Sequence, residues 1–172
     1  GTTYGQSNDI MYAVESLFPD NKSLRPPEGM EMEAQGLLRL ERQIFSAWMY
    51  WLTGSGNTER FRESFVATLN EVEAALSRRG PFFLGKDVTI VDFMFAPFLE
   101  RMAASLLFYK GFQMRVPKGA STNFPAVNKW FDAMESLPSY QLTKSDYYTH
   151  CWDLPPQLGG CTYEEAGEPY EN

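Results

Sequence analysis

The segment PFFLGKDVTIVDFMFAPFL, residues 81–99, places a charge and a proline inside the most apolar stretch of the chain. Asp92 follows Thr89 by three positions, which is the spacing of an N-terminal capping box, where two side chains satisfy the free backbone N–H groups of a helix start. We therefore interpret Asp92 as the structural cap of a buried helix over about 89–110, in preference to a catalytic carboxylate. Pro97 lies beyond the first turn and is expected to kink this helix.

The rest of the chain also shows the periodicity of helices. No region alternates with period two over a useful length, so the sequence predicts an all-helical body. The expected helices cover about residues 7–17, 33–52, 58–78, 125–137 and part of 139–152, and the second of these carries Leu37, Leu40, Ile44, Trp48 and Trp51 on one face.

The charge, apolar content and cysteine count of the chain disfavour several classes of function. The 172 residues include 15 Lys and Arg against 22 Asp and Glu, a net charge of -7, which disfavours binding to nucleic acid or to anionic lipid. No run approaches the ~20 apolar residues of a membrane-spanning helix. Cys151 and Cys161 cannot form a disulfide framework, and no Cys/His cluster has metal-ligand spacing. A reducing compartment is expected, although the two thiols could form one local bridge.

Four regions follow from the local composition. Residues 1–20 are interpreted as the end of a strand followed by a helix. The apolar stripe of this helix, Ile10, Val14 and Leu17, has nothing in the adjacent sequence to pack against. We therefore expect these residues to be the end of a domain whose earlier part precedes them. Residues 21–32 carry Pro26, Pro27 and Gly29 and form a linker. Residues 33–150 form the helical domain. Residues 151–172 form an irregular acidic tail rich in Pro and Gly, expected to pack on the body to about Cys161, through positions such as Trp152 and Leu154, and to contact a partner beyond.

Three stretches in order resemble the glutathione S-transferase family. FFLGKDVTIVDFMFAPFL is similar to the buried capping-box helix of the family's C-terminal helical domain, YGQSNDIMYAVESLFP to the end of its thioredoxin-like N-terminal domain, and FPAVNKWFDAMESLPSYQLT to its late helix pair. The closing stretch SDYYTHCWDLPPQLGGC is similar to plant and algal members. The resemblance implies an all-α bundle of the C-terminal type, preceded by the last strand and helix of a truncated thioredoxin-like domain.

The same resemblance implies a glutathione site. In the family the residue pair that corresponds to Gln6 and Ser7 holds the γ-glutamyl end of glutathione, and a hydroxyl at a positive helix end suits a carboxylate. A plain N-cap explains Ser7 equally well. The activating Tyr, Ser or Cys of the family and its cis-proline stretch would precede Gly1, so no catalytic residue is assigned within the chain.

Candidates for a second substrate lie on the first long helix. An apolar substrate pocket is expected from Arg42, Trp48 and Trp51, with Met49 and Tyr50 beside them, although an aromatic stripe at helical spacing is also typical of a core. His150, the single histidine, is expected to be a packed or surface imidazole, and Cys151 has no activating neighbour in the sequence. Arg78 and Arg79 fit the C-terminal end of a helix.

Two functions remain open at this point. One is an enzyme that conjugates glutathione to a small apolar electrophile or transfers a thiol, with its activating residue outside the chain. The other is a non-catalytic helical module, a scaffold or assembly subunit that binds a protein partner through its tail. Either protein is expected to be intracellular, in the cytosol or a plastid, and to form a dimer or part of a larger complex.

Overall fold

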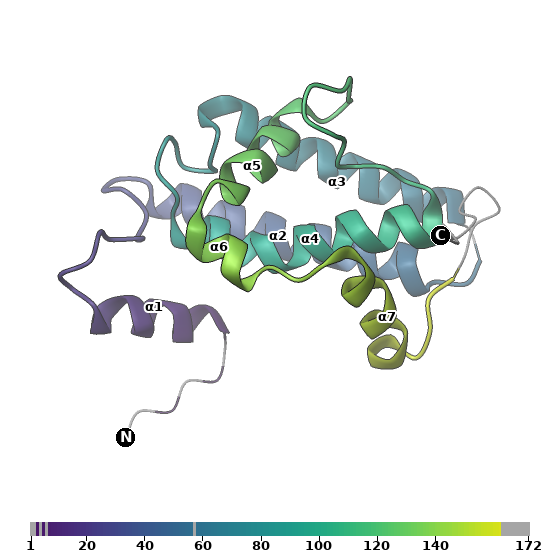
Figure 1. Cartoon of the computed structure of the whole chain (residues 1–172), viewed down its shortest axis with the longest axis horizontal. Coiled ribbons are helices and arrows are strands. Elements are labelled where there is room, and N and C mark those ends of the chain that lie inside the picture. The colour runs from purple at the N-terminus through teal and green to yellow at the C-terminus, as the bar shows by residue number, and fades with distance from the viewer. Residues whose placement is uncertain (1–2, 4, 6, 57, 163–172) are drawn as a thin grey trace.

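The structure of the protein is a computed structural model that describes residues 3, 5, 7–56 and 58–162. All regular structure within these residues is helical, as expected, apart from one isolated β-bridge between Phe82 and Gly85. Figure 1 shows the arrangement of the helices, which are α1 (Ser7–Leu17), α2 (Glu31–Thr53), α3 (Thr58–Arg79), α4 (Ile90–Lys110), α5 (Pro125–Glu135), α6 (Pro138–Thr143) and α7 (Tyr147–Leu158).

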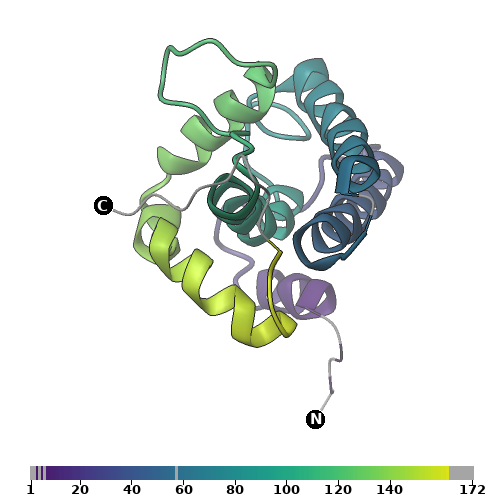
Figure 2. The same ribbon diagram turned by 90° about the vertical axis from the view of Figure 1, so that its right-hand side faces the viewer.

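The helical body is built around α4. Seen end-on in Figure 2, α4 lies at the centre, with α2 and α3 on one side, α5 to α7 on the other and α1 below. The expected apolar stripe of α2 is buried in this core, and Phe65, Leu69, Val72 and Leu76 of α3 pack there as well. A helix enclosed by neighbours must be apolar on every face, which accounts for the composition of α4.

The start of α4 has the predicted capping box. Oδ2 of Asp92 accepts a hydrogen bond from the backbone N–H of Thr89 at 2.9 Å and another from the Thr89 hydroxyl at 3.0 Å. Asp92 is fully buried, and burial raises the pKa of its carboxyl, while its hydrogen bonds act in the opposite direction. The structural interpretation of this aspartate is therefore confirmed. The helix continues through Pro97 without a break.

The C-terminal region differs from the expectation of an irregular tail. Residues 151–158 belong to α7, although they include Pro155 and Pro156. Asp146 caps this helix by accepting from the backbone N–H of Thr149 at 2.9 Å. Pro155 cannot donate to the carbonyl of Cys151 four residues earlier, and the hydroxyl of Tyr109 on α4 donates to it instead, at 2.8 Å. A tertiary contact thus replaces the missing helical hydrogen bond.

The segment after α7 packs on the body, as predicted for residues up to about Cys161. The backbone N–H of Thr162 donates to the carbonyl of Leu52 at 2.9 Å, and Lys110 Nζ donates to the Thr162 hydroxyl at 2.7 Å. Leu154 is buried, whereas Trp152, expected to pack inward, is 72% exposed. Residues 163–172, for which partner contact was predicted, lie outside the described residues.

No helix in the described ranges is both long enough and apolar enough to span a bilayer.

Candidate functional site

An apolar groove runs beneath α1. It has a volume of about 480 Å³ and lies between α1, the linker, the start of α4 and α6. Met11, Val14 and Phe18 line it from α1, and Ile90 and Phe93 line it from α4. A site of this size and character fits an apolar body of small-molecule dimensions.

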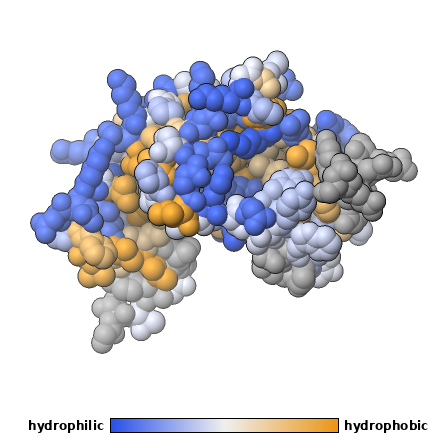
Figure 3. Space-filling view, in the orientation of Figure 1, coloured by the Kyte–Doolittle hydropathy of each residue, from blue (hydrophilic) through white to orange (hydrophobic). Residues whose placement is uncertain are grey.

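The apolar face formed by α1 and by Phe18 after it is largely exposed within the described part of the chain, and Ile10, Val14 and Phe18 of this face also line the groove. Ile10, Val14, Leu17 and Phe18 are all exposed, Leu17 to 73%. Figure 3 shows this face as an apolar patch over α1 at the lower left. The stripe that the sequence placed on this helix, Ile10, Val14 and Leu17, is therefore a surface feature, which is unusual for three large apolar side chains in one short helix.

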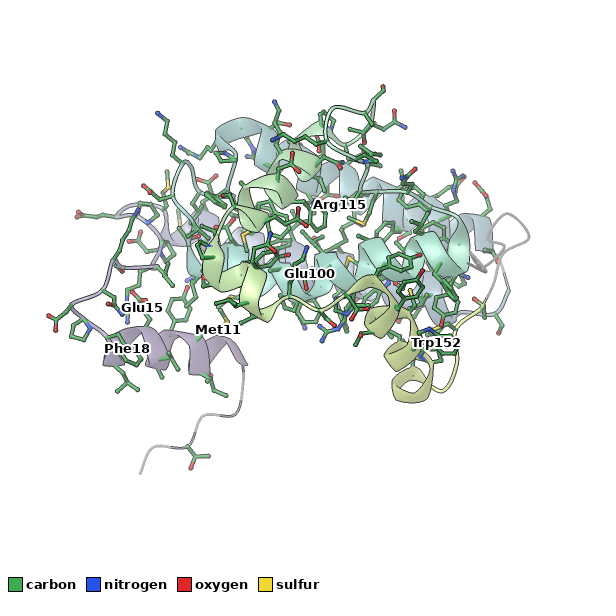
Figure 4. The ribbon with its side chains drawn as sticks, in the orientation of Figure 1. Met11, Glu15, Phe18, Glu100, Arg115 and Trp152 are labelled. Atoms are coloured by element: carbon green, nitrogen blue, oxygen red, sulfur yellow. The ribbon has the colours of Figure 1, made fainter. Side chains whose placement is uncertain are left out.

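Polar contacts hold α1 in place relative to the linker. The carboxylate of Glu15 accepts hydrogen bonds from the Ser23 hydroxyl at 2.7 Å and from the backbone N–H of Leu24 at 3.0 Å. The carbonyl of Leu24 in turn accepts from the backbone N–H of Ile90 at 2.7 Å. Figure 4 shows Glu15 on the side of α1 towards the linker. These contacts fix α1 above the start of α4, so the groove has a defined shape.

Ser7, one of the two predicted glutathione-binding residues, is the first residue of α1. The helix begins at Ser7, which agrees with the expected boundary. Gln6 lies outside the described residues. The binding role of both residues stays a prediction.

Arg42, a predicted pocket residue, lies on the surface of α2 beside two aromatic rings. Its guanidinium carbon lies 5.0 Å from the ring centre of Phe45 and 4.8 Å from that of Phe98. The same guanidinium pairs with Glu41, whose side chain is almost fully buried. A buried carboxylate requires such a partner, so Arg42 has a structural task that the sequence did not reveal. Its binding role stays a prediction.

Trp48 and Trp51, the other two predicted pocket residues, are core residues. Their exposed fractions are 2% and 1%. The indole nitrogen of Trp48 donates to the hydroxyl of Ser105 at 3.0 Å. Trp51 packs against Phe65 and Phe112, with ring centres 5.5 and 5.3 Å apart. The prediction that these indoles line an open substrate pocket is therefore wrong, and the alternative, that the aromatic stripe belongs to the core, is correct.

The flanking residues of that stripe divide between the core and the surface. Met49 packs at the edge of the core, whereas Tyr50 is exposed and stacks on Phe61, with ring centres 6.3 Å apart. Neither lies in the groove beneath α1.

The thiols are poorly suited to nucleophilic chemistry. Cys151 is buried, and burial raises the pKa of its thiol to about 12. Burial also raises the pKa of the half-buried Cys161 thiol. Both thiols are free, so the local bridge is not formed in this structure. Cys151 lacks the electropositive, accessible surroundings of a reactive thiol, and at Cys161 the effect of burial outweighs that of the nearby Lys110 charge.

The sequence did not reveal a buried polar cluster between α4, α6 and α7. The imidazole of His150 is packed, not on the surface, which is one of the two expected alternatives. Its Nε2 lies 3.6 Å from Oε2 of Glu100. Burial, together with the hydrogen bond and charge of Glu100, raises the pKa of Tyr140. Figure 4 shows Glu100 in the middle of the body, away from α1. The cluster joins three helices and meets the groove at Tyr140, which also lines it. It has no local sequence signature because its members come from different helices.

Comparison with protein families identifies the central part of the chain. Residues 55–133 match the family model for the glutathione S-transferase C-terminal domain. Glutathione S-transferase DHAR2 of Arabidopsis thaliana is 25% identical to the chain over 146 residues, which cover 84% of this chain and 62% of that protein. The chain thus spans about three fifths of the length of this curated relative.

Two solved structures have the same fold. The dehydroascorbate reductase of Chlamydomonas reinhardtii superposes with a TM-score of 0.69 at 18% identity, over 89% of this chain and 66% of that one. Leishmania TDR1, described as a trimeric glutathione transferase, superposes with a TM-score of 0.70 at 20% identity, over 91% of this chain and 36% of that one. These two likenesses show that the chain has the fold of glutathione S-transferases, and the matched family model identifies residues 55–133 as a glutathione S-transferase C-terminal domain.

Proposed function

We propose that the protein carries out glutathione-dependent thiol chemistry on a small apolar electrophile, by conjugation or by thiol transfer. The observation that carries this proposal is the apolar groove beneath α1 in a chain with a glutathione S-transferase C-terminal domain. The relatives support the same class of reaction, because one is named a glutathione S-transferase and another a dehydroascorbate reductase. Glutathione is the expected co-substrate.

The N-terminal end of α1 is the proposed anchor for glutathione. A helix start presents free backbone N–H groups and a partial positive charge, both of which favour a carboxylate. Gln6 and Ser7 would bind the γ-glutamyl end at this position. The hydrogen bonds of Glu15 to the linker support the proposal, because they hold this helix in a fixed place above the groove. Arg42 is a candidate for contact with the second substrate.

We also propose the domain arrangement that this function needs. Residues 1–20 would be the end of a thioredoxin-like domain, residues 21–32 its linker and residues 33–158 the helical domain. The exposed apolar face of α1 supports this arrangement, because a thioredoxin-like domain would cover it. That domain would also supply the activating residue, a task for which the buried thiol of Cys151 is unsuited.

Glutathione consumption tests the proposal. The protein encoded by the complete natural reading frame would be assayed with glutathione and either an aromatic halide or dehydroascorbate. The first substrate reports conjugation and the second reports thiol-dependent reduction. Turnover of either one above a heat-denatured control supports the proposal and selects the reaction. If neither substrate is turned over and the protein is not retained on immobilised glutathione, the enzymatic function is rejected.

A scaffold role is the second candidate, and one surface favours it. Tyr148 and Trp152, one turn apart on α7, are both strongly exposed. Large exposed aromatic side chains are enriched at sites of protein contact. As a scaffold, the protein would bind a partner through α7 and the acidic tail, in the cytosol or a plastid. In this case, light scattering after size-exclusion chromatography of the native complex would show a hetero-assembly. Trp152→Ser would dissociate this assembly. Tyr50→Ser, a control at another exposed aromatic residue, would leave it intact.

A further inference from the structure

A basic cleft lies between the end of α3 and the start of α5, away from the groove beneath α1. Its volume is about 550 Å³. Arg78 and Arg79 line it from α3 and Lys129 lines it from α5. Ser77 is also a lining residue, and no carboxylate is among the lining residues. This concentration of positive charge is notable in a chain whose net charge is -7.

Two of the three cations have no polar partner within the part of the chain that the structure describes. Arg79 pairs with Glu33, with Nη2 3.1 Å from the carboxylate oxygen. Among the described residues, neither Arg78 nor Lys129 has a hydrogen bond or an ion pair. Surface cations in an acidic protein usually have carboxylates nearby, so two unpaired cations facing one cleft leave a local positive potential.

Glu73, an acidic side chain at the start of α5, is already engaged. Glu73 accepts hydrogen bonds from the backbone N–H groups of Ala126 and Val127, both at 2.8 Å. These bonds cap α5 and hold the carboxylate against the helix start. Within the described residues Glu73 makes no ion pair with Lys129, and its capping bonds fix the wall of the cleft that Ala126 and Lys129 line.

The opposite wall is equally well fixed. The backbone N–H of Gly80 donates to the carbonyl of Leu76 at 2.8 Å, and a Cβ atom at position 80 would lie 2.9 Å from that oxygen. Glycine is thus required where the chain leaves α3. The negative end of α3 accounts for arginine at positions 78 and 79. It does not account for Lys129, which comes from another helix.

We propose that this cleft binds a phosphate dianion, either free or as a small phosphate monoester. A guanidinium fork suits two phosphate oxygens, and a lysine ammonium adds a point charge. The cleft is large enough for a phosphate group with a short organic body. This proposal is independent of glutathione chemistry, because none of the cleft residues lines the groove beneath α1.

Amide chemical shifts of the full protein, titrated at constant ionic strength with chloride as the balancing anion, test this site. The probes are inorganic phosphate and glycerol 3-phosphate. We expect saturable shifts at Gly80, Ala126 and Lys129 with both probes. The double variant Arg78→Gln/Lys129→Gln should weaken binding at least tenfold. The control Lys86→Gln/Lys118→Gln removes the same charge elsewhere on the exposed surface and should leave affinity unchanged.

The comparison of the two probes assigns the ligand. Tighter binding of glycerol 3-phosphate indicates a phosphorylated metabolite, and equal affinities indicate the free anion. Shifts that rise linearly with no saturation, or an equal loss in both double variants, would overturn the proposal, because either result means that only net charge matters. Unchanged melting temperatures of both double variants confirm that the fold is intact during the comparison.

Discussion

The indole nitrogen of Trp130 on α5 donates a hydrogen bond to Oδ1 of Asp92, at 3.0 Å. The same oxygen accepts from the backbone N–H of Phe83 at 3.0 Å, and the other carboxylate oxygen accepts from Thr89. One buried side chain thus joins the start of α4, the connection before it and α5. Its hydrogen bonds compensate for the burial of the carboxylate.

Asp92→Ala should destabilise the domain by about 3 kcal/mol or more. The substitution leaves buried N–H donors of Phe83, Thr89 and Trp130 without an acceptor, and each such loss costs about 1–3 kcal/mol. Urea unfolding measures the change. Asp87→Ala, at an exposed ion pair, is the control and should shift stability by less than about 0.5 kcal/mol. An Asp92→Ala variant as stable as the wild type but inactive would contradict the structural role.

Tyr109→Phe should destabilise α7 in particular. The hydroxyl of Tyr109 supplies the hydrogen bond to the carbonyl of Cys151 that Pro155 cannot make, and a buried unpaired carbonyl costs about 1–3 kcal/mol. Hydrogen exchange should become faster across α7 and remain unchanged in α3. Tyr148→Phe, on the exposed face of the same helix, is the matched control. Equal exchange in both variants would show that the Tyr109 hydroxyl has no such role.

The sequence predicted most of the helical body, because α2, α3 and α5 each have a regular apolar face and a clear start or stop, and α4 is an apolar run that begins at a capping box. It predicted the cap at Asp92 for the same reason, since a capping box is local. The donors Phe83 and Trp130 could not be predicted, because they reach the carboxylate only after tertiary folding. The helical state of residues 151–158 was missed because the local cost of two prolines is offset by a distant tyrosine.

The candidate site was less predictable than the fold. Helical spacing placed Trp48 and Trp51 on one face of α2 but could not decide whether that face meets solvent or core. The exposed face of α1 shows the converse, because a pattern typical of burial lies on the surface. The pairing of Arg42 with Glu41 also depends on which neighbour is buried, and periodicity gives no such information.

Cys151 should resist alkylation in the folded protein. With a pKa of about 12, only about one thiol in ten thousand is ionised at pH 8, and the side chain is also buried. Iodoacetamide labelling followed by peptide mass spectrometry should modify the half-buried Cys161 first. Cys151→Ser should retain any glutathione-dependent activity. Rapid labelling of Cys151, or loss of activity in the serine variant, would contradict the assignment of a structural thiol.

Two truncations locate the end of the folded domain. A chain ending at Thr162 keeps the hydrogen bonds to Leu52 and Lys110, and it should melt within about 1 °C of the full chain. A chain that ends at Cys161 loses both hydrogen bonds and should be less stable by about 1–2 kcal/mol. Thermal unfolding by circular dichroism compares them. Unfolding of the longer truncated chain would place residues 163–172 in the core and remove the basis for partner contact by the tail.

Calorimetric titration of glutathione into the protein encoded by the complete reading frame tests the central claim most directly. We predict saturable binding that Ser7→Ala weakens by about tenfold or more, as expected when a hydrogen bond to a carboxylate is lost. Ser64→Ala, at an exposed position on α3, should bind like the wild type. Wild-type protein that binds no glutathione, or a Ser7→Ala variant with unchanged affinity, would contradict the proposed site at the start of α1.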